Sequence, residues 1–269
     1  MRSPMKIAGS VAVITGGARG IGLAIGRFLA ARGARVVLGD VLQAAVERAA
    51  EEIRAEGGEA LAVEADVTRE ADVERLMDAA IERFGAIQVV IANAGIARDG
   101  LMLSRDPATG KVRRNLSAED FRAVVEVNLT GAFLTLAEGA RRMAEPGTPG
   151  VLFVISSINK AGQPGQLNYA SAKAAVALWP KILAAELHWS GFVGIRVVGI
   201  APGYTRTEAL EAMEQASLEA VLKDAPLGRL VEPDELAATI ALAIENEAIN
   251  GTTIEVSGGV AFGPWQRAK

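Results

Sequence analysis

The sequence predicts an α/β protein in which about seven parallel strands form one doubly wound sheet with helices on both faces. Short apolar runs alternate with helical patterns from one end of the chain to the other, which is the order of right-handed βαβ units. No Pro/Ser-rich linker, internal repeat or low-complexity run interrupts this alternation. The chain has 269 residues, 50% of them hydrophobic, so it can bury one large core, and we expect residues 1–269 to form a single domain.

In the first half of the chain each predicted strand is followed by a predicted helix. Apolar runs between polar or glycine-rich residues predict strands over 11–14, 35–39, 59–63 and 89–92. Apolar residues repeated at helical spacing predict helices after the glycine turn that ends at residue 22, and over 44–56 and 71–84. Successive strands joined by helices lie parallel, so both faces of this sheet should be covered.

The second half keeps this order but contains two long irregular segments. Helices are expected over 121–144, over 169–190 and from Pro233 onward, with strands over 151–155, 195–200 and 253–256. Residues 97–118 form a polar, turn-rich insertion that can hold a small hairpin centred near residues 109 and 110. Residues 203–228, with helical character over 208–222, are expected to form a lid over the substrate.

The composition excludes several classes of function. The chain has no Cys and a single His, His188, so it can form neither a disulfide nor a thiolate zinc site, and we expect no metal centre. The formal net charge of -4 gives no general attraction to nucleic acid or to an anionic membrane. No run reaches the roughly 18 apolar residues that a membrane span requires. We therefore expect a cytoplasmic protein that acts on a small molecule.

The first predicted strand-to-helix turn contains Gly16, Gly20 and Gly22. Without side chains there, the backbone can approach a pyrophosphate, and the N-terminus of the following helix offers unpaired N–H groups and a positive dipole end. The spacing favours a Rossmann-type dinucleotide site, although any tight βα turn also tolerates glycine.

An acidic residue strengthens the dinucleotide interpretation. Asp40 follows the second predicted strand, where this fold places a carboxylate against the adenosine ribose. A 2′-phosphate in the same place would meet a like charge, so Asp40 favours NAD over NADP. Two alternatives remain: Asp40 can instead cap the next helix, and Arg19 can act as a phosphate partner that favours NADP.

Tyr169 and Lys173 are four residues apart on a predicted helix. Side chains at this spacing stand on the same face, so we expect the ammonium to lower the pKa of the phenol. A phenol tuned in this way is a credible acid or base near neutral pH. Taken alone, the pair could equally be a packed tyrosine beside a solvated lysine.

Other short motifs occur in order around these residues. They are Thr15-Gly16-X-X-X-Gly20-Ile21-Gly22, Asp66-Val67, Asn93-Ala94-Gly95, Asn128, Ser156-Ser157, Tyr169-X-X-X-Lys173, Pro202-Gly203 and Ser257-Gly258-Gly259. Together they resemble the short-chain dehydrogenase/reductase family over nearly the whole chain. Within that family, the chain is similar to the branch that contains 3-oxoacyl-acyl-carrier-protein reductases and NAD-linked secondary alcohol dehydrogenases.

The resemblance implies hydride transfer between NAD(H), or alternatively NADP(H), and a secondary alcohol or ketone, with Tyr169 as the general acid/base. Lys173 would lower the pKa of Tyr169 and bind the nicotinamide ribose, and Asn128 would hold a water that links Lys173 to solvent. Further coenzyme contacts are implied for Gly16, Arg19, Gly20, Ile21, Gly22, Asp40, Asp66, Val67, Asn93, Ala94, Gly95, Pro202, Gly203, Thr205 and Thr207.

A serine at the end of the 151–155 strand would hydrogen-bond the substrate oxygen. Counting back thirteen residues from Tyr169, the family's usual interval, gives Ser156, whereas counting along the strand from Gly150 gives Ser157. We favour Ser157, because strand register is tied to the sheet and loops absorb deletions more easily. The glycine that the family often has three residues after this serine is absent, because Ile158-Asn159-Lys160 follow.

The walls of the substrate site are expected to be mostly apolar with scattered amides, which suits a secondary alcohol or ketone of modest size. The expected residues are Ser156, Ile96, Lys160, Gln163, Leu167, Tyr204, Leu210 and Met213. The basic cluster Lys111, Arg113 and Arg114 in the 97–118 insertion either borders this cleft or is simply solvated.

The predicted helix 169–190 is apolar almost all round, which indicates burial on both sides. The resemblance implies that a homotetramer or homodimer covers the second side; the alternative is burial within the monomer. The residues leave two other functions open. An NADPH-dependent 3-oxoacyl-acyl-carrier-protein reductase would need basic residues for an acidic carrier, such as Arg141 and Arg142, and Asp40 argues against it. A non-catalytic nucleotide-sensing regulator would not need a tuned tyrosine.

Overall fold

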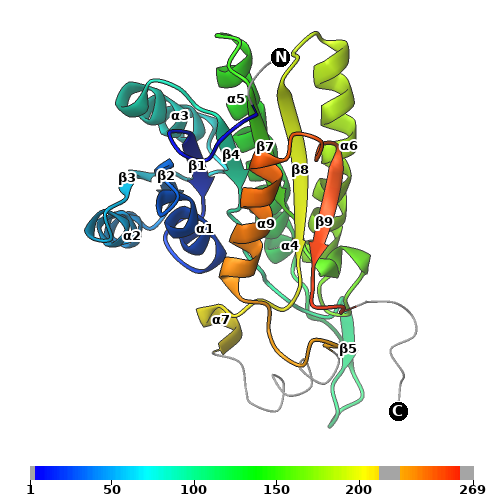
Figure 1. Cartoon of the computed structure of the whole chain (residues 1–269). Helices are drawn as coiled ribbons and strands as arrows, with labels where there is room; N and C mark the ends of the chain where they lie inside the picture. The colour runs from blue at the N-terminus through cyan, green and yellow to red at the C-terminus, as the bar shows by residue number, and fades with distance from the viewer. Residues whose placement is uncertain (1–3, 212–224, 261–269) are drawn as a thin grey trace.

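A computed structural model describes residues 4–211 and 225–260 of the chain (Figure 1). Its centre is a seven-stranded sheet with the order β3-β2-β1-β4-β7-β8-β9, and every pairing in it is parallel. The strands are β1 Val11–Thr15, β2 Arg35–Asp40, β3 Glu59–Glu64, β4 Val89–Ala92, β7 Gly150–Ile155, β8 Ile195–Pro202 and β9 Thr252–Val256. The predicted fold class is confirmed, and the sequence placed all seven strands to within two residues at each end.

Helices cover both faces of the sheet because neighbouring residues of a strand point to opposite sides. Ala12 and Ile14 of β1 pack with the helices of one face, and Val11 and Val13 pack with those of the other. The first face carries α1 Gly20–Ala30, α2 Gln43–Ala55 and α9 Pro233–Glu245, and the second carries α3 Glu70–Phe84, α5 Ala132–Ala144 and α6 Leu167–Trp189.

The predicted helix over 121–144 is wrong in one respect, because the structure divides it into three segments. These are α4 Ala118–Val125, the π-helix η1 Glu126–Gly131, and α5. Gly131 lies against the loop after β3, where a Cβ would come within 2.6 Å of Val67 Cγ2. A π-turn inserts one residue into the helix, and such turns occur often at functional sites. Here it carries Asn128, which is 1% exposed.

The 97–118 insertion contains a hairpin of two antiparallel strands, β5 Leu103–Arg105 and β6 Val112–Arg114. Asp106 holds the turn between them, since its Oδ1 accepts from the N–H groups of Ala108 and Thr109. The hairpin stands apart from the main sheet, and its basic residues are exposed.

The carboxyl ends of the strands meet at one end of the molecule, where Figure 1 also shows the hairpin and the short helix α7 Glu208–Glu211. Of the segment expected to be helical over 208–222, residues 212–222 lie outside the described residues. In open α/β sheets, ligands bind beyond the carboxyl ends of the strands. No helix within residues 4–211 and 225–260 is long and apolar enough to cross a membrane.

Candidate active site

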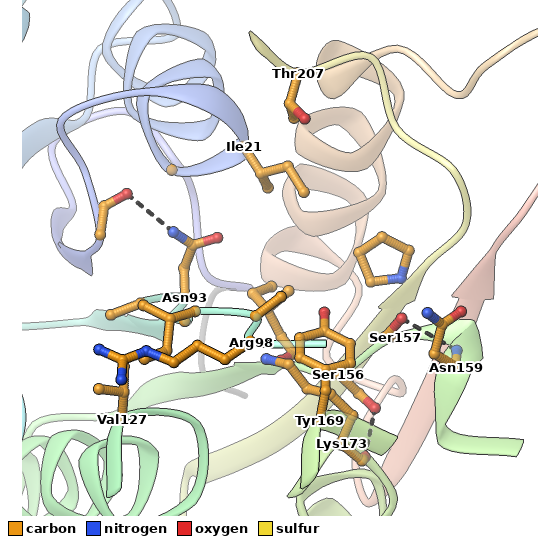
Figure 2. Close-up of a pocket in the computed structure, with 18 of the residues that line it drawn as sticks. Ile21, Asn93, Arg98, Val127, Ser156, Ser157, Asn159, Tyr169, Lys173 and Thr207 are labelled. Carbon is orange, nitrogen blue, oxygen red and sulfur yellow. Dashed lines mark hydrogen bonds between the residues drawn. The ribbon is translucent and has the colours of Figure 1, made fainter. Parts of the chain in front are cut away.

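A cavity of about 1110 Å³ opens at the carboxyl ends of β1, β2, β3, β4, β7 and β8 (Figure 2). The residues proposed from the sequence that line it are Gly16, Arg19, Ile21, Gly22, Asp40, Asp66, Val67, Asn93, Ala94, Gly95, Ile96, Ser156, Ser157, Gln163, Tyr169, Lys173, Pro202, Gly203, Tyr204, Thr205, Thr207 and Leu210. Gly20, Asn128, Lys160 and Leu167 do not line it, and Met213 lies outside the described residues.

The turn between β1 and α1 is compact because glycine occupies its tightest points. A Cβ on Gly22 would lie 2.1 Å from the carbonyl oxygen of Gly16, and a Cβ on Gly16 would lie 2.8 Å from Ala94 Cα. Gly16 also has a φ of 65°, a conformation that side chains disfavour. Asn93 joins this turn to the end of β4, because its Nδ2 donates to the carbonyl oxygens of Thr15 and Gly16 at 2.9 and 3.1 Å.

The N-terminus of α1 faces the cavity with its positive dipole end uncompensated. Its N-cap residue, Arg19, makes no side-chain capping bond, and the first turn carries no acidic residue. The first N–H groups of a helix have no partner within the helix, so they attract an anion such as a pyrophosphate. This donor set fits the phosphates of a dinucleotide.

Asp40 lies at the end of β2 on the cavity wall. Its Oδ2 accepts from the N–H of Ala18 at 3.2 Å and its Oδ1 from the N–H of Leu42 at 3.1 Å. The N-cap position of α2 is Leu42, so Asp40 does not serve as the N-cap residue of that helix. The backbone bonds hold the carboxylate in place, and its remaining lone pairs can accept from ribose hydroxyls.

Three further segments complete the wall on this side. Asp66 is fixed by its own loop, since its Oδ1 accepts from both N and Oγ1 of Thr68. After β8, the Thr205 hydroxyl donates to the carbonyl oxygen of Gly203, and Thr205 is 6% exposed. Thr207 lies across the cavity from Tyr169 and Lys173 in Figure 2. Its methyl group lies 3.6 Å from the position a Cβ on Gly20 would occupy.

Tyr169 and Lys173 stand together on α6, and the Lys173 Nζ is 5.6 Å from the centre of the Tyr169 ring. Burial raises the pKa of Tyr169, a hydrogen bond with Ser157 lowers it, and the charge of Asp99 raises it further. The net effect raises the pKa of Tyr169, so the prediction that the Lys173 ammonium lowers this pKa is wrong for this structure. Burial also lowers the pKa of Lys173 to about 8, which leaves it mostly protonated at pH 7.

Lys173 is held by the backbone around it and is 4% exposed. Its Nζ donates to the carbonyl oxygen of Ile155 at 2.8 Å. A Cβ on Gly95 would lie 3.6 Å from this nitrogen and 3.3 Å from Asn128 Oδ1, so the three residues are close neighbours. Asn128 itself bonds both backbone groups of Ile96, accepting from N at 2.8 Å and donating to O at 2.9 Å.

The two candidate serines point in different directions. Ser156 Oγ donates to the carbonyl oxygen of Lys173 at 2.7 Å and is 2% exposed, so its hydroxyl serves the packing of α6 on β7. Ser157 lines the cavity with Tyr169 and lowers the pKa of its phenol, and its Oγ accepts from the N–H of Asn159 at 3.1 Å (Figure 2). Ser157 therefore has the position of a substrate-binding hydroxyl.

The expected substrate wall is partly different. The Lys160 ammonium forms an ion pair with Glu255 at 2.6 Å, and Leu167 is 49% exposed on the surface. In place of these two, the wall contains polar residues that sequence reasoning missed, namely Arg98, Asp99, Asn159 and Gln166. They belong to loops, and no periodicity marks such positions.

A buried asparagine that sequence reasoning also missed fixes the edge of this wall. Asn168, 0% exposed, donates through Nδ2 to the carbonyl oxygen of Arg98 at 3.0 Å. It therefore ties the loop after β4 to the start of α6.

One end of the cavity presents the N-terminus of α1, which can bind an anion, and the other end presents Tyr169 and Lys173 with Ser157. This combination defines a dinucleotide-dependent oxidoreductase.

Comparison with known proteins gives the same class. Residues 10–217 match the family model described as short chain dehydrogenase. An uncharacterised oxidoreductase of Mycobacterium bovis is 41% identical over 252 residues, which cover 92% of this chain and 95% of that protein.

Two solved structures are also similar. A 3-ketoacyl-(acyl-carrier-protein) reductase from Brucella melitensis complexed with NADH has 32% identity and a TM-score of 0.80, over 96% of this chain and 100% of that one. A 7α-hydroxysteroid dehydrogenase complexed with NADH and 7-oxo glycochenodeoxycholic acid has 30% identity and a TM-score of 0.84, over 95% and 96%. The chain belongs to the short-chain dehydrogenase family and is an oxidoreductase that acts on CH–OH or keto groups.

Proposed function

We propose that the protein is an NAD-dependent dehydrogenase or reductase that interconverts a secondary alcohol and a ketone. The observation that carries this proposal is that Ser157, Tyr169 and Lys173 line the same cavity as Asp40, with the Lys173 Nζ 5.6 Å from the centre of the Tyr169 ring. The bound nicotinamide supplies the hydride exchange. The residues of the chain supply orientation and the proton.

In alcohol oxidation, Ser157 binds the substrate oxygen and Tyr169 takes the hydroxyl proton; in reduction, Tyr169 returns it to the carbonyl oxygen. Lys173 holds positive charge beside the phenolate that forms, and binds the nicotinamide ribose. Asn128 acts on the other side of Lys173 and holds a water that connects it to solvent. Its contacts with Ile96 fix the amide in position for this role.

We propose NAD as the preferred coenzyme because Asp40 is a carboxylate where NADP would place its 2′-phosphate. Two of the similar solved structures contain NADH. Arg19 is exposed at the rim of the cavity and is the residue that could favour NADP. Of the segment 203–228 expected to form a lid, residues 212–224 lie outside the described residues, and five of the residues before them line the cavity together with residues 97–99 of the insertion.

We propose a homotetramer or homodimer in the cytoplasm, without nucleic-acid or membrane partners. Three large apolar side chains support the assembly, because they remain exposed on α5 and α6: Phe133 is 56% exposed, Leu178 64% and Ile182 48%. Apolar side chains gathered on neighbouring helices indicate a surface that another subunit covers.

A second candidate is an NADPH-dependent 3-oxoacyl-acyl-carrier-protein reductase; one of the similar structures is a reductase of this substrate class, but it is complexed with NADH. The basic residues considered for the carrier are already paired within the chain: Arg141 with Glu138 and Glu145, and Arg142 with Asp78 and Glu138. A non-catalytic regulator is disfavoured, because it would not need the arrangement of Ser157, Tyr169 and Lys173.

The test uses Tyr169→Phe. Removing the phenolic hydroxyl should reduce turnover of a panel of secondary alcohols by about 10²–10⁴-fold. NADH affinity, measured by the fluorescence of the reduced nicotinamide, should change less than about threefold because the ring and Lys173 remain. Near-normal turnover in the variant would remove Tyr169 as the acid/base. Tighter binding of NADPH than NADH by the unaltered protein would move the acyl-carrier-protein reductase into first place.

A further inference from the structure

One wall of the cavity carries a carboxylate that the proposed reaction does not use. Asp99 lines the cavity together with Tyr169, Ser157 and Gln163. Its Oδ2 accepts a hydrogen bond from Gln166 Nε2 at 2.7 Å, whereas its Oδ1 has no hydrogen-bond partner within residues 4–211 and 225–260. One oxygen of this exposed, cavity-lining carboxylate is thus held in place, and the other is free to accept a hydrogen bond from a ligand.

The position of this carboxylate is fixed from two sides. Gln166 Oε1 accepts from Asn159 Nδ2, so the two amides connect Asp99 to the segment that follows Ser157. The backbone N–H of the next residue, Gly100, donates to the carbonyl oxygen of Gly165 at 2.7 Å. Groups that are held before a ligand arrives bind it at a lower entropic cost.

The two cations nearest to Asp99 along this wall are held by other groups. Arg98 forms an ion pair with Asp120 at 3.0 Å, and Figure 2 shows its side chain directed toward Val127. The Lys173 Nζ donates to the carbonyl oxygen of Ile155. Apart from the Lys173 ammonium beside Tyr169, Asp99 is thus the charged group of this wall that has no ion-pair partner among the described residues.

We propose that Asp99 determines substrate specificity. It selects a neutral alcohol or ketone that carries a hydroxyl group in addition to the reacting oxygen, and it rejects a substrate that carries a carboxylate in place of that hydroxyl. This inference rests on the proposed reaction, because it assigns the substrate class of the same site. The hydroxyl donates to the open Oδ1 of Asp99 while the reacting oxygen lies between Ser157 and Tyr169.

The physical reason is the cost of placing like charges together. Two carboxylates within a few ångströms of each other repel, and even near a protein surface this repulsion amounts to a few kcal/mol. The carboxylate of Asp99 is within electrostatic reach of the reacting groups, since its charge already raises the pKa of Tyr169. A hydroxyl of the substrate would instead gain a charge-assisted hydrogen bond.

The test compares ketones in pairs that share one carbon skeleton, with a hydroxymethyl group in one member and a carboxylate in the other. For the unaltered protein with NADH, we expect kcat/KM for the hydroxyketone to exceed that for the keto acid about tenfold or more. Asp99→Asn removes the charge and should reduce this ratio about five- to tenfold, mainly by improving the keto acid. Asp99→Glu keeps the charge and should keep the ratio above unity.

Glu119→Gln is the matched control. Glu119 is an exposed carboxylate in the first turn of the nearby α4 and does not line the cavity, so its neutralisation should leave the ratio unchanged within about twofold. An equal change in both variants would indicate a long-range effect of net charge, and would overturn the assignment of Asp99.

A binding measurement tests the preference for the hydroxyketone over the keto acid independently of turnover. Calorimetric titration of the same pairs into Tyr169→Phe saturated with NADH should show tighter binding of the hydroxyketone, and Asp99→Asn in that background should remove the difference. Equal affinity of the two members, or no measurable binding of the hydroxyketone, overturns the proposal. Charge preference in binding without turnover of any pair would instead count against the proposed reaction and support Asp99.

Discussion

The two ends of the cavity are built by different means. At the coenzyme end, Asn93 and Asp40 bond the β1–α1 turn, but its shape depends on close backbone packing, because a Cβ on Gly16 or Gly22 would collide. At the substrate end, the wall is fixed by side-chain hydrogen bonds among Asp99, Gln166 and Asn159, which join loops far apart in sequence. The glycines of the turn can hardly be replaced, because any side chain would overlap neighbouring atoms, whereas the polar side chains of the substrate wall can be exchanged for others. Substrate specificity can therefore change while the coenzyme site is retained.

The largest effect expected from this contrast is that of Gly22→Ala. A Cβ there would lie 2.1 Å from Gly16 O and 2.6 Å from Asn93 Nδ2, so the turn must open. We expect a loss of about 3 kcal/mol or more in the free energy of unfolding, and loss of NADH binding. Chemical denaturation and fluorescence titration measure the two effects.

Gly100→Ala is the matched substitution at the substrate end. A Cβ there would lie no closer than 3.5 Å to Leu116, which is an ordinary contact. Its stability should stay within about 1 kcal/mol of the unaltered protein. A similar loss in the free energy of unfolding for Gly22→Ala and Gly100→Ala would show that the coenzyme end is no more tightly packed than the substrate end.

Lys173→Met should separate activity from stability. Burial lowers the pKa of Lys173 from 10.5 to about 8, so the folded state bears the cost of a buried ammonium at neutral pH. We expect turnover to be abolished while the free energy of unfolding rises by about 1–3 kcal/mol at pH 7. Thermal or denaturant unfolding of both proteins at the same pH measures the gain.

The gain from Lys173→Met should depend on pH. Below about pH 8 the lysine is protonated in both the folded and the unfolded state, and the cost of burial is complete. Between about pH 8 and 10.5 the folded state releases its proton first, so the unaltered protein recovers stability relative to the variant. A gain that grows as pH rises through this window would contradict a buried, depressed lysine.

The smallest effect concerns coenzyme choice at Asp40. Asp40→Asn keeps the shape of the side chain and removes the charge that opposes a 2′-phosphate. We expect the preference for NADH over NADPH to fall about tenfold, with stability changed by less than about 1 kcal/mol, because the amide oxygen can still accept one of the two backbone bonds. Fluorescence titration at fixed ionic strength measures the preference. Unchanged selectivity would leave Asp40 with a purely structural role in bonding Ala18 and Leu42.

Several features of the site were predictable because they depend on neighbours along the chain. Tyr169 and Lys173 share one helix face at a spacing of four residues, and the glycines of the first turn lie between a strand and a helix. The strand register also favoured Ser157, and in the structure this serine lines the cavity beside Tyr169 while the Ser156 hydroxyl bonds the backbone of α6.

Local pattern by itself determined the order of strands and helices, and hence the sheet, because side-chain periodicity is a property of consecutive residues. Only the tertiary structure decided the π-turn at Asn128, the upward direction of the Tyr169 pKa, and the place of Asp99. Asp99 and Gln166 are 67 residues apart, and Asn128 bonds a backbone 32 residues away. Such contacts, and the burial that sets a pKa, exist only once the sheet has brought distant loops to one end of the molecule.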